Sequence, residues 1–412
     1  MSATLNRQLR ALAATPGTGW LALAIGVSLA FLYSPGTFDV ATWLDRRWLP
    51  SAEEFGLIEG YTQAHDNYPP LSFLMIGLVG PAAHSLGLTP FVVFKLVLFA
   101  FLTCTTLLTW FVTRRPLVAL AMHLPLTVSA MLHGYTDVLY APQLVLTCWL
   151  LQKQRLAAAS AVFTLGALMK YQPLILAPVL VLHALAPSLS PISWRDLRRR
   201  ASALLLPACT LCLTARLIFG EWTTDSLRAA LRGHTWLSAN ALNAGWLVAS
   251  ALAPADPLSV QVKDGLLWKL PGLLCAGGLA LSLVGYWRSR RDLPSALAFA
   301  GLGYLSYFMF NLGVHENHLC PAVILCTLAA AADPGRFAAL AYWPVAAVLN
   351  HLLFYGFTGE GFPFRRDLAG LDLTVPFALL NLLVYCRCVW SLRTMVLAEP
   401  MPSAGPLRAG VA

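Results

Sequence analysis

Charged residues are scarce in this sequence. Asp, Glu, Lys and Arg make up only 11% of its 412 residues, whereas a soluble globular domain contains about 25%. So few charges cannot cover several soluble domains with a hydrated surface, which excludes a cytosolic enzyme. The high hydrophobic content also excludes an intrinsically disordered chain, because disorder requires low hydrophobicity and abundant charge.

Cysteine is present but lacks the pattern of a disulfide framework or a zinc site. The nine cysteines lie almost wholly inside apolar segments. Cys209 and Cys212 form a Cys-x-x-Cys pair within one such segment, with no histidine at zinc-binding spacing. We therefore expect them to be packing residues, and a disulfide-stapled secreted protein is excluded.

Long apolar runs dominate what remains. Hydrophobic residues make up 58% of the chain and the mean hydropathy is +0.66. The runs are unbroken rather than alternating, which excludes a transmembrane β-barrel. Since one membrane-spanning helix needs roughly 20 apolar residues, the runs predict an all-α polytopic membrane protein, a single domain over 1–412 with about 12 transmembrane helices. The expected spans are 17–34, 91–113, 117–132, 137–151, 156–169, 173–186, 201–219, 265–287, 295–312, 319–332, 337–355 and 371–390.

Basic residues form short clusters between the apolar runs, and the formal net charge is +9. This spacing is typical of cytoplasmic loops and follows the positive-inside rule, so nucleic acid is not an expected partner. All clusters share one side only if 71–88 does not cross the membrane. We therefore predict an interfacial or re-entrant segment there, which its glycines and proline favour. The basic clusters are Arg114–Arg115, Lys153–Arg155, Arg195–Arg200 and Arg288–Arg291.

This topology places two large loops, 35–90 and 220–264, on the outer, non-cytoplasmic face, together with most acidic residues. We expect a functional site on that face. The lack of an organelle signal and the compact loops favour a bacterial inner membrane, with the site facing the periplasm.

The first outer loop carries Asp39 just beyond the first expected span. A carboxylate at the membrane–water boundary has a pKa raised toward that of a general base. Alternatively, Asp39 only caps the helix that begins at Val40. Further along, Tyr68 precedes two prolines that fix an extended backbone and begin a helix.

Two isolated charges flank the next spans. Asp137 ends the short turn that begins at His133, and it either caps the following helix or serves a site. Lys170 is the sole charge between two spans. It either extends to lipid phosphates or binds a substrate phosphate.

The stretch from Asn311 to His318 places ionisable groups between two apolar runs. Because ionisable groups at a membrane cost stability, this placement favours a functional site. His315 and His318 have the His-x-x-His spacing of a metal site, but a third ligand is missing. His315 as a hydrogen-bond or charge partner of a phosphate is the favoured interpretation.

Five motifs in order, over about residues 35 to 325, resemble the GT-C superfamily of integral-membrane glycosyltransferases. They are similar to bacterial mannosyltransferase-like proteins and to the dolichyl-phosphate-glucose glucosyltransferases. The motifs are FDVATW with DNYPPL, GYTD, LMKYQPLILAP, SANALNAGWL and GVHENHLCPAV.

The resemblance implies a hexosyltransferase. It would move a hexose, mannose or glucose, from a polyprenyl-phosphate donor to a hydroxyl of a lipid-linked or surface glycan, with inversion. Asp39 would be the base. A divalent metal is not expected as a cofactor, because the phosphate leaving group is already a weak base. A membrane transporter or flippase of a lipid-linked or small polar substrate is the alternative, and a non-catalytic scaffold subunit is a third.

Two further groups of site residues follow from this expected reaction. A phosphate in a water-poor site needs electrostatic stabilisation, and the candidates to bind the donor phosphate are His315, Lys170, Arg365 and Arg366, with His315 favoured by the resemblance. The donor and acceptor would be positioned by Tyr68, Asp66, Asp137, Asn240, Asn243, Glu316 and His318.

Overall fold

The structure is a computed structural model, and it describes residues 16–37, 40, 43–65, 67–187, 192–232, 235–357, 359 and 367–398. Helices make up most of this part of the chain, so the all-α prediction is confirmed. Within the same residues the strands are limited to one two-residue antiparallel pair, β1 (Asp367–Leu368) and β2 (Leu371–Asp372).

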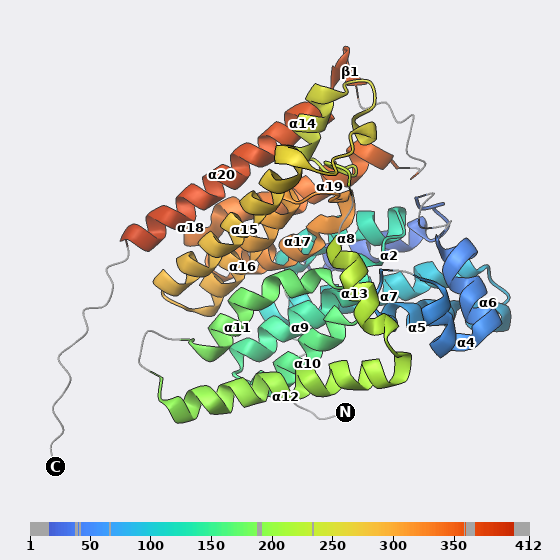
Figure 1. The fold of residues 1–412 in the computed structure, drawn as a ribbon, viewed down its shortest axis with the longest axis horizontal. Coiled ribbons are helices and arrows are strands. Elements are labelled where there is room, and N and C mark those ends of the chain that lie inside the picture. Colours follow the sequence, from blue (N-terminus) through green and yellow to red (C-terminus); the bar gives the residue numbers. More distant parts are fainter. Residues whose placement is uncertain are drawn as a thin grey trace.

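The N-terminal half forms the blue to green helices of Figure 1. Several helices begin with proline at the first helical position, where its missing N–H costs nothing; α7 also has the side chain of Thr89 as its cap. In chain order the elements are α2 (Thr18–Ser28), η1 (Leu29–Phe31), η2 (Leu44–Trp48), α4 (Leu49–Gln63), α5 (Pro70–Gly77), α6 (Val79–Leu86), α7 (Pro90–Thr113), α8 (Pro116–Thr127), η3 (Val128–Leu132), η4 (Thr136–Tyr140), α9 (Ala141–Gln152), α10 (Leu156–Ala167), η5 (Gln172–Leu176), α11 (Ala177–Leu185) and α12 (Trp194–Phe219).

The C-terminal half forms the yellow to red helices. Its long helices α15 and α16 and the shorter α17 follow one another as packed neighbours. In chain order the elements are α13 (Trp222–Arg232), α14 (Ala244–Leu252), η6 (Pro257–Ser259), α15 (Gly265–Arg288), α16 (Leu293–Phe310), η7 (Glu316–Leu319), α17 (Cys320–Ala332), α18 (Pro334–Phe337), η8 (Ala338–Tyr342), α19 (Trp343–Tyr355) and α20 (Thr374–Ala398).

Six helices in the described part are long and apolar enough to cross a membrane, which is compatible with an integral membrane protein. Each of the other expected spans overlaps a shorter helix, so the total of about twelve remains a prediction. The six are Pro90–Thr113, Trp194–Phe219, Gly265–Arg288, Leu293–Phe310, Pro334–Tyr355 and Thr374–Thr394.

The segment 71–88 folds as two helices, α5 and α6, that meet at Leu78. Each has eight residues and therefore rises only about 12 Å. Together they form one apolar helical stretch, Pro70–Leu86, which rises about 25 Å, less than a hydrocarbon core of about 30 Å. Its interfacial or re-entrant placement remains a prediction.

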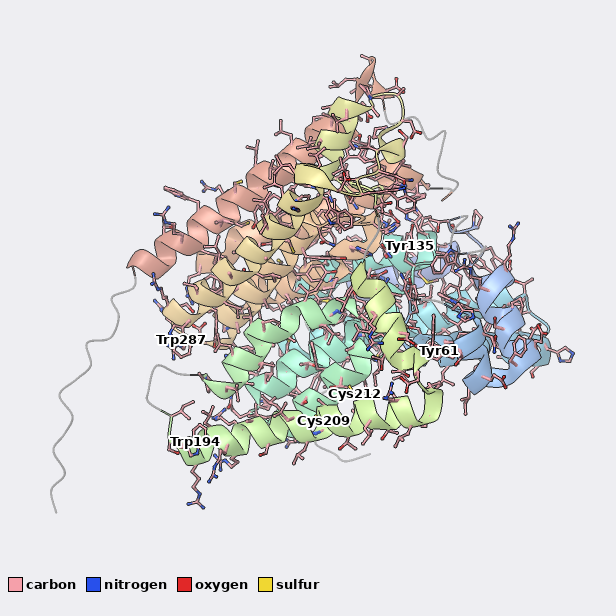
Figure 2. The ribbon with its side chains drawn as sticks, viewed as in Figure 1. Tyr61, Tyr135, Trp194, Cys209, Cys212 and Trp287 are labelled. Atoms are coloured by element: carbon pink, nitrogen blue, oxygen red, sulfur yellow. The ribbon has the colours of Figure 1, made fainter. Side chains whose placement is uncertain are left out.

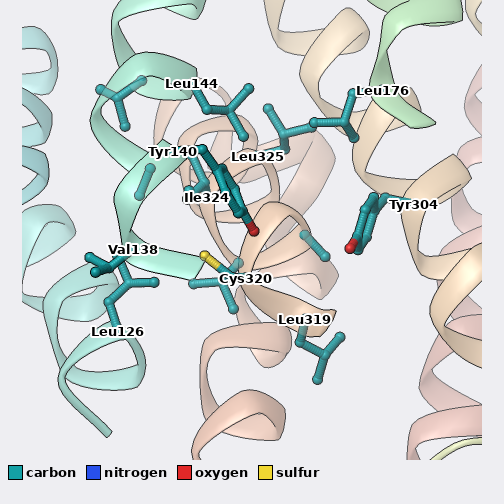
Figure 3. Close-up of a cluster of buried hydrophobic side chains, with 14 of the residues drawn as sticks. Leu126, Val138, Tyr140, Leu144, Leu176, Tyr304, Leu319, Cys320, Ile324 and Leu325 are labelled. Carbon is teal, nitrogen blue, oxygen red and sulfur yellow. The ribbon is translucent and has the colours of Figure 1, made fainter. Parts of the chain in front are cut away.

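The core lies between α16, α17 and the η4–α9 segment. Figure 3 shows Tyr140 and Tyr304 reaching into it from different elements, beside Ile324 and Cys320 of α17. In the most apolar stretch of α16, 78% of the residues are buried. In the corresponding stretches of α12 and α15, only 11% of the residues are buried. The latter two therefore present most of their apolar surface to the surroundings, as lipid-facing helices do.

Candidate functional site

A buried ion pair lies at the start of η4. The Nζ of Lys170 is 2.8 Å from Oδ2 of Asp137, and both side chains are nearly or fully buried. The Nδ2 of Asn317 donates to the same oxygen at 2.7 Å, and the hydroxyl of Tyr140 is 3.5 Å from Oδ1. We call Asp137, Lys170, Asn317 and Tyr140 the aspartate cluster.

In the aspartate cluster the two charges pair with each other, and a role of either one in binding a substrate stays a prediction. The carboxylate of Asp137 accepts from Lys170 and Asn317, and η4 has no side-chain cap. Lys170 points inward to this pair rather than outward to lipid. Burial lowers the pKa of Lys170, but the charge of Asp137 and the nearby Tyr68 hydroxyl outweigh it, so this pKa is raised above its ordinary value.

An aromatic wall covers one side of Lys170. Its ammonium lies 5.3 Å from the ring centroid of Tyr68, and that ring packs edge-on against Trp43 at 6.1 Å and Trp48 at 5.1 Å. The hydroxyl of Tyr61 donates to the backbone carbonyl of Tyr68 at 3.0 Å. Helix η2 and the turn before α5 thus hold Tyr68 against the lysine, and the cation is attracted to the ring face.

A second polar group surrounds Glu316, which is fully buried. Tyr135 hydrogen-bonds to Glu316 and to Tyr355, and burial together with the charge of Glu316 holds the pKa of Tyr135 well above its ordinary value. Nδ2 of Asn350 donates to the backbone carbonyl of Glu316 at 2.8 Å. We call Glu316, Tyr135, Tyr355 and Asn350 the glutamate cluster.

Two histidines extend the glutamate cluster. His133 and His351 face each other with their Nδ1 atoms 3.3 Å apart, and Nε2 of His133 donates to the carbonyl of Gly356 at 2.9 Å. Burial, only partly offset by that hydrogen bond, lowers the pKa of His133 to about 4. His133 is therefore neutral at pH 7, with the proton on Nε2. Lys95 is also fully buried nearby and donates to the carbonyl of Met131.

A single turn of helix, η7, joins the two clusters. Glu316 and Asn317 are consecutive in it, and they contact the glutamate and aspartate clusters respectively. His315 and His318 flank them and are half-buried. Their ring centroids are 5.4 Å apart, and the ring of His318 stacks on Tyr307, its Nδ1 3.3 Å from the hydroxyl.

The loop 220–264 runs beside η7. Ala239 pairs with His315 in a parallel bridge, with the amide of Ala239 donating to the carbonyl of Val314 at 2.9 Å. Nδ2 of Asn240 donates to Tyr355 at 3.0 Å, while its Oδ1 is buried without a hydrogen-bond partner among the described residues. Asn240 can thus present an acceptor to a ligand.

The two asparagines of the SANALNAGWL motif differ in what they do. Oδ1 of Asn243 accepts from the amide of Trp246 at 2.9 Å, and its Nδ2 donates to the carbonyl of Phe308 at 3.0 Å. Asn243 is fully buried as the cap of α14. A role of Asn243 in substrate binding stays a prediction, but its visible role is structural.

The segment that follows α2 and η1 also contacts the His133–Gly134 turn. The amide of Thr37 donates to the carbonyl of His133 at 2.9 Å, and Val40 packs against Gly134. Gly36 has φ +74°, and a Cβ there would lie 2.8 Å from the ring of Phe91, so a larger residue would strain this contact. The four remaining predicted residues, Asp39, Asp66, Arg365 and Arg366, lie outside the described residues.

Sequence reasoning did not select Lys95, Tyr135, Asn317, Asn350 or His351. Lys95, Asn350 and His351 each interrupt an apolar run, which is the signal that a polar residue in a membrane segment serves a purpose. Tyr135 and Asn317 lie within the GYTD and GVHENHLCPAV motifs, which do not by themselves show what these two side chains contact. Only the fold shows that they contact the predicted acids.

No group of three or more His, Cys, Asp and Glu side chains in the described ranges is arranged to hold a metal ion. Comparison with known proteins gives no family: no protein-family model matches the chain, and no curated protein shows significant similarity to it.

Proposed function

We propose that the protein is a GT-C-type hexosyltransferase that uses a polyprenyl-phosphate-linked sugar at the non-cytoplasmic face of a bacterial inner membrane. One observation carries the proposal: turn η7 brings the Asp137–Lys170 pair and Glu316 together. Both first- and second-loop segments lie against these clusters. Buried ionisable groups in an apolar bundle cost stability, so such a concentration favours a functional site.

Lys170 is the residue proposed to bind the donor phosphate. Asp137, itself held by Asn317, fixes the ammonium from one side, and the aromatic wall of Tyr68, Trp43 and Trp48 covers another. A phosphate oxygen shared with this ammonium gains a charge-assisted hydrogen bond in a site poor in water. The aromatic wall offers an apolar face for the hexose. His315 and His318, half-buried beside η7, supply further donors.

Asp39 is the residue proposed to activate the acceptor. Its described neighbours, Thr37 and Val40, contact the His133–Gly134 turn three residues before Asp137. The carboxylate would take the proton of the acceptor hydroxyl while that oxygen attacks the anomeric carbon. The bond from that carbon to the phosphate oxygen breaks, and polyprenyl phosphate leaves with the electron pair. One displacement inverts the anomeric configuration, and Asp137, Asn240 and Glu316 would orient the reactants.

The test is release of polyprenyl phosphate from a sugar-labelled polyprenyl-phosphate donor by the purified protein with a glycan acceptor. We expect Asp39→Asn to abolish release while expression and detergent extraction stay normal. Asp45→Asn is the matched control, because Asp45 is an exposed acid of the same loop. Near-wild-type release by Asp39→Asn would remove Asp39 from the base role. Movement of the intact donor across vesicles without release would indicate a transporter.

A further inference from the structure

We propose that the start of α12 and the end of α15, on either side of the end of α11, bind the phosphate headgroup of an anionic phospholipid. The three helix ends lie together because α11 packs against both α12 and α15. Figure 2 shows Trp194 of α12 and Trp287 of α15 at this same end of the bundle. It is the end of α11 remote from Lys170, and the predicted topology places it on the cytoplasmic side. The inference therefore stands apart from the proposed function.

Hydrogen bonds hold the two helix ends on either side of α11. The guanidinium of Arg200 donates to the carbonyl of Ala184 at 3.0 Å. The hydroxyl of Tyr286 donates to the carbonyl of Arg291 at 3.1 Å, so it accepts from Nδ1 of His183, which is 2.8 Å away. The side chains of His183 and Tyr286 are buried. Two consecutive residues of α11 thus fix the start of α12 and the end of α15 relative to each other.

Positive charge is concentrated at these two helix ends. Residues 195–200 contain four arginines and one aspartate, and residues 288–292 contain three arginines and one aspartate. The two segments together therefore carry a net charge of +5. We call their arginines the arginine patch, which consists of Arg195, Arg198, Arg199, Arg200, Arg288, Arg290 and Arg291.

The arginine patch is not neutralised by the acids around it. Both aspartates of the two segments are already paired with arginines at 3.2 Å. Within the described residues, no acidic side chain pairs with Arg195, Arg198 or Arg288. The start of α12 is also the positive end of its helix dipole, where arginines are unfavourable and an anion is favourable. A phosphate there would gain charge-assisted hydrogen bonds from the arginines and would offset this repulsion.

Exposed tryptophans place the arginine patch at the depth of lipid headgroups. Trp194 is 70% exposed and Trp287 is 48% exposed, and tryptophan is enriched at the boundary between lipid and water. The guanidinium of Arg291 lies 3.6 Å from the ring centroid of Trp287. Further along the same two helices the exposed side chains are apolar, as at Leu205 and Leu281. A phospholipid matches this order of groups, because its acyl chains follow its phosphate, whereas a soluble anion would leave the apolar surface uncovered.

Lipid binding to the purified full-length protein tests this proposal. The protein in detergent is titrated with dioleoyl phosphatidylglycerol or with dioleoyl phosphatidylcholine, and bound lipid is counted by native mass spectrometry. The two lipids share their acyl chains and a phosphate, but the choline of the second is a cation that the arginines repel. We expect phosphatidylglycerol to bind about tenfold more tightly. Inorganic phosphate should not displace it, because a free anion covers none of the apolar surface.

A pair of charge-removing variants locates the binding site. Arg195→Gln/Arg288→Gln removes one exposed arginine from each side of α11. Lys263→Gln/Lys269→Gln is the matched control, because it removes two exposed lysines near the start of α15, at the other end of that helix. We expect the first variant to bind phosphatidylglycerol about thirtyfold more weakly, the equivalent of about 2 kcal/mol for two arginines near lipid phosphates. The control should bind it as the wild type does, and both variants should keep the thermal midpoint of the lipid-free protein.

Salt gives a second measurement on the same proteins. Because salt screens exposed charges, added sodium chloride should weaken binding of phosphatidylglycerol to the wild type and should weaken it less in Arg195→Gln/Arg288→Gln. Equal affinity for the two lipids, equal losses in the two variants, or the same salt dependence in wild type and patch variant would each overturn the proposal. Displacement of the lipid by inorganic phosphate would assign the arginine patch to a soluble anion instead.

Discussion

The ion pair between Asp137 and Lys170 gives the most direct prediction. In Asp137→Asn, the side chain keeps its shape, so the oxygen that Lys170 and Asn317 approach at 2.8 and 2.7 Å can stay in place. Only the negative charge is lost, and the buried ammonium is left without its counter-charge. Breaking a buried pair in this way costs about 3–5 kcal/mol.

The double variant Asp137→Asn/Lys170→Met separates the cost of an unpaired charge from the cost of losing the pair. It removes both charges and keeps the approximate volume of the lysine side chain. Replacement of a buried pair by uncharged groups is often close to neutral. We therefore expect the thermal midpoint in detergent, followed by fluorescence-detected size exclusion, to fall clearly in Asp137→Asn and to recover largely in the double variant.

The same set of variants distinguishes a structural pair from a functional one. If the pair only supports the fold, sugar transfer returns with stability in the double variant. The proposed function expects the double variant to be stable and still inactive, because Lys170 is missing. Lys170→Met alone completes the double-mutant cycle, and strictly additive destabilisation in this cycle would refute the coupling that the geometry implies.

Three further predictions concern the neighbouring groups. Glu316→Gln should keep the thermal midpoint at or above that of the wild type, because it removes a buried charge, but lower the transfer rate about a hundredfold through misplaced reactants; an unchanged rate would exclude Glu316 from the site. His133 is neutral in the fold with a pKa of about 4, and the unfolded chain takes up its proton below about 6.5. Stability should therefore fall as the pH drops from 6.5 to 4. The thermal midpoint of His133→Gln should differ less between pH 7 and pH 5 than the midpoint of the wild type does. An equally large difference in the variant would contradict this account. Asn243→Ala removes the cap of α14 and should cost about 1–2 kcal/mol of stability; a midpoint equal to that of the wild type would mean that the cap contributes nothing.

The all-α class and the approximate helix positions could be predicted from the sequence. Apolar runs of sufficient length predict helices whatever their partners are. Helices α7 and α15 follow the expected ranges closely, whereas α20 continues to Ala398, beyond the expected end at 390. The number of spans could not be settled in this way. Segments such as α5, α6 and α10 are short, and their depth in a membrane depends on packing rather than on composition.

The residues of the candidate site could be predicted only in part from the sequence. Lys170 and Asp137 could be selected because each is an isolated charge beside apolar runs. Their pairing could not, since 33 positions separate them in the chain. Asn317 lies 180 positions from Asp137. Periodicity within one segment carries no information on such contacts, which depend on how α10, η4 and η7 pack together.

Consecutive residues in the connection between α10 and η5 link the aspartate cluster to the aromatic wall. Lys170 pairs with Asp137, whereas Tyr171 hydrogen-bonds to Ser226 of α13 at 2.7 Å. Tyr61 hydrogen-bonds to the same Ser226 hydroxyl at 2.9 Å and donates to the backbone carbonyl of Tyr68. A displacement of Tyr171 would therefore disturb both the lysine and the aromatic wall. Under the proposed function, the position of the phosphate-binding lysine thus depends on the contact between Tyr171 and α13.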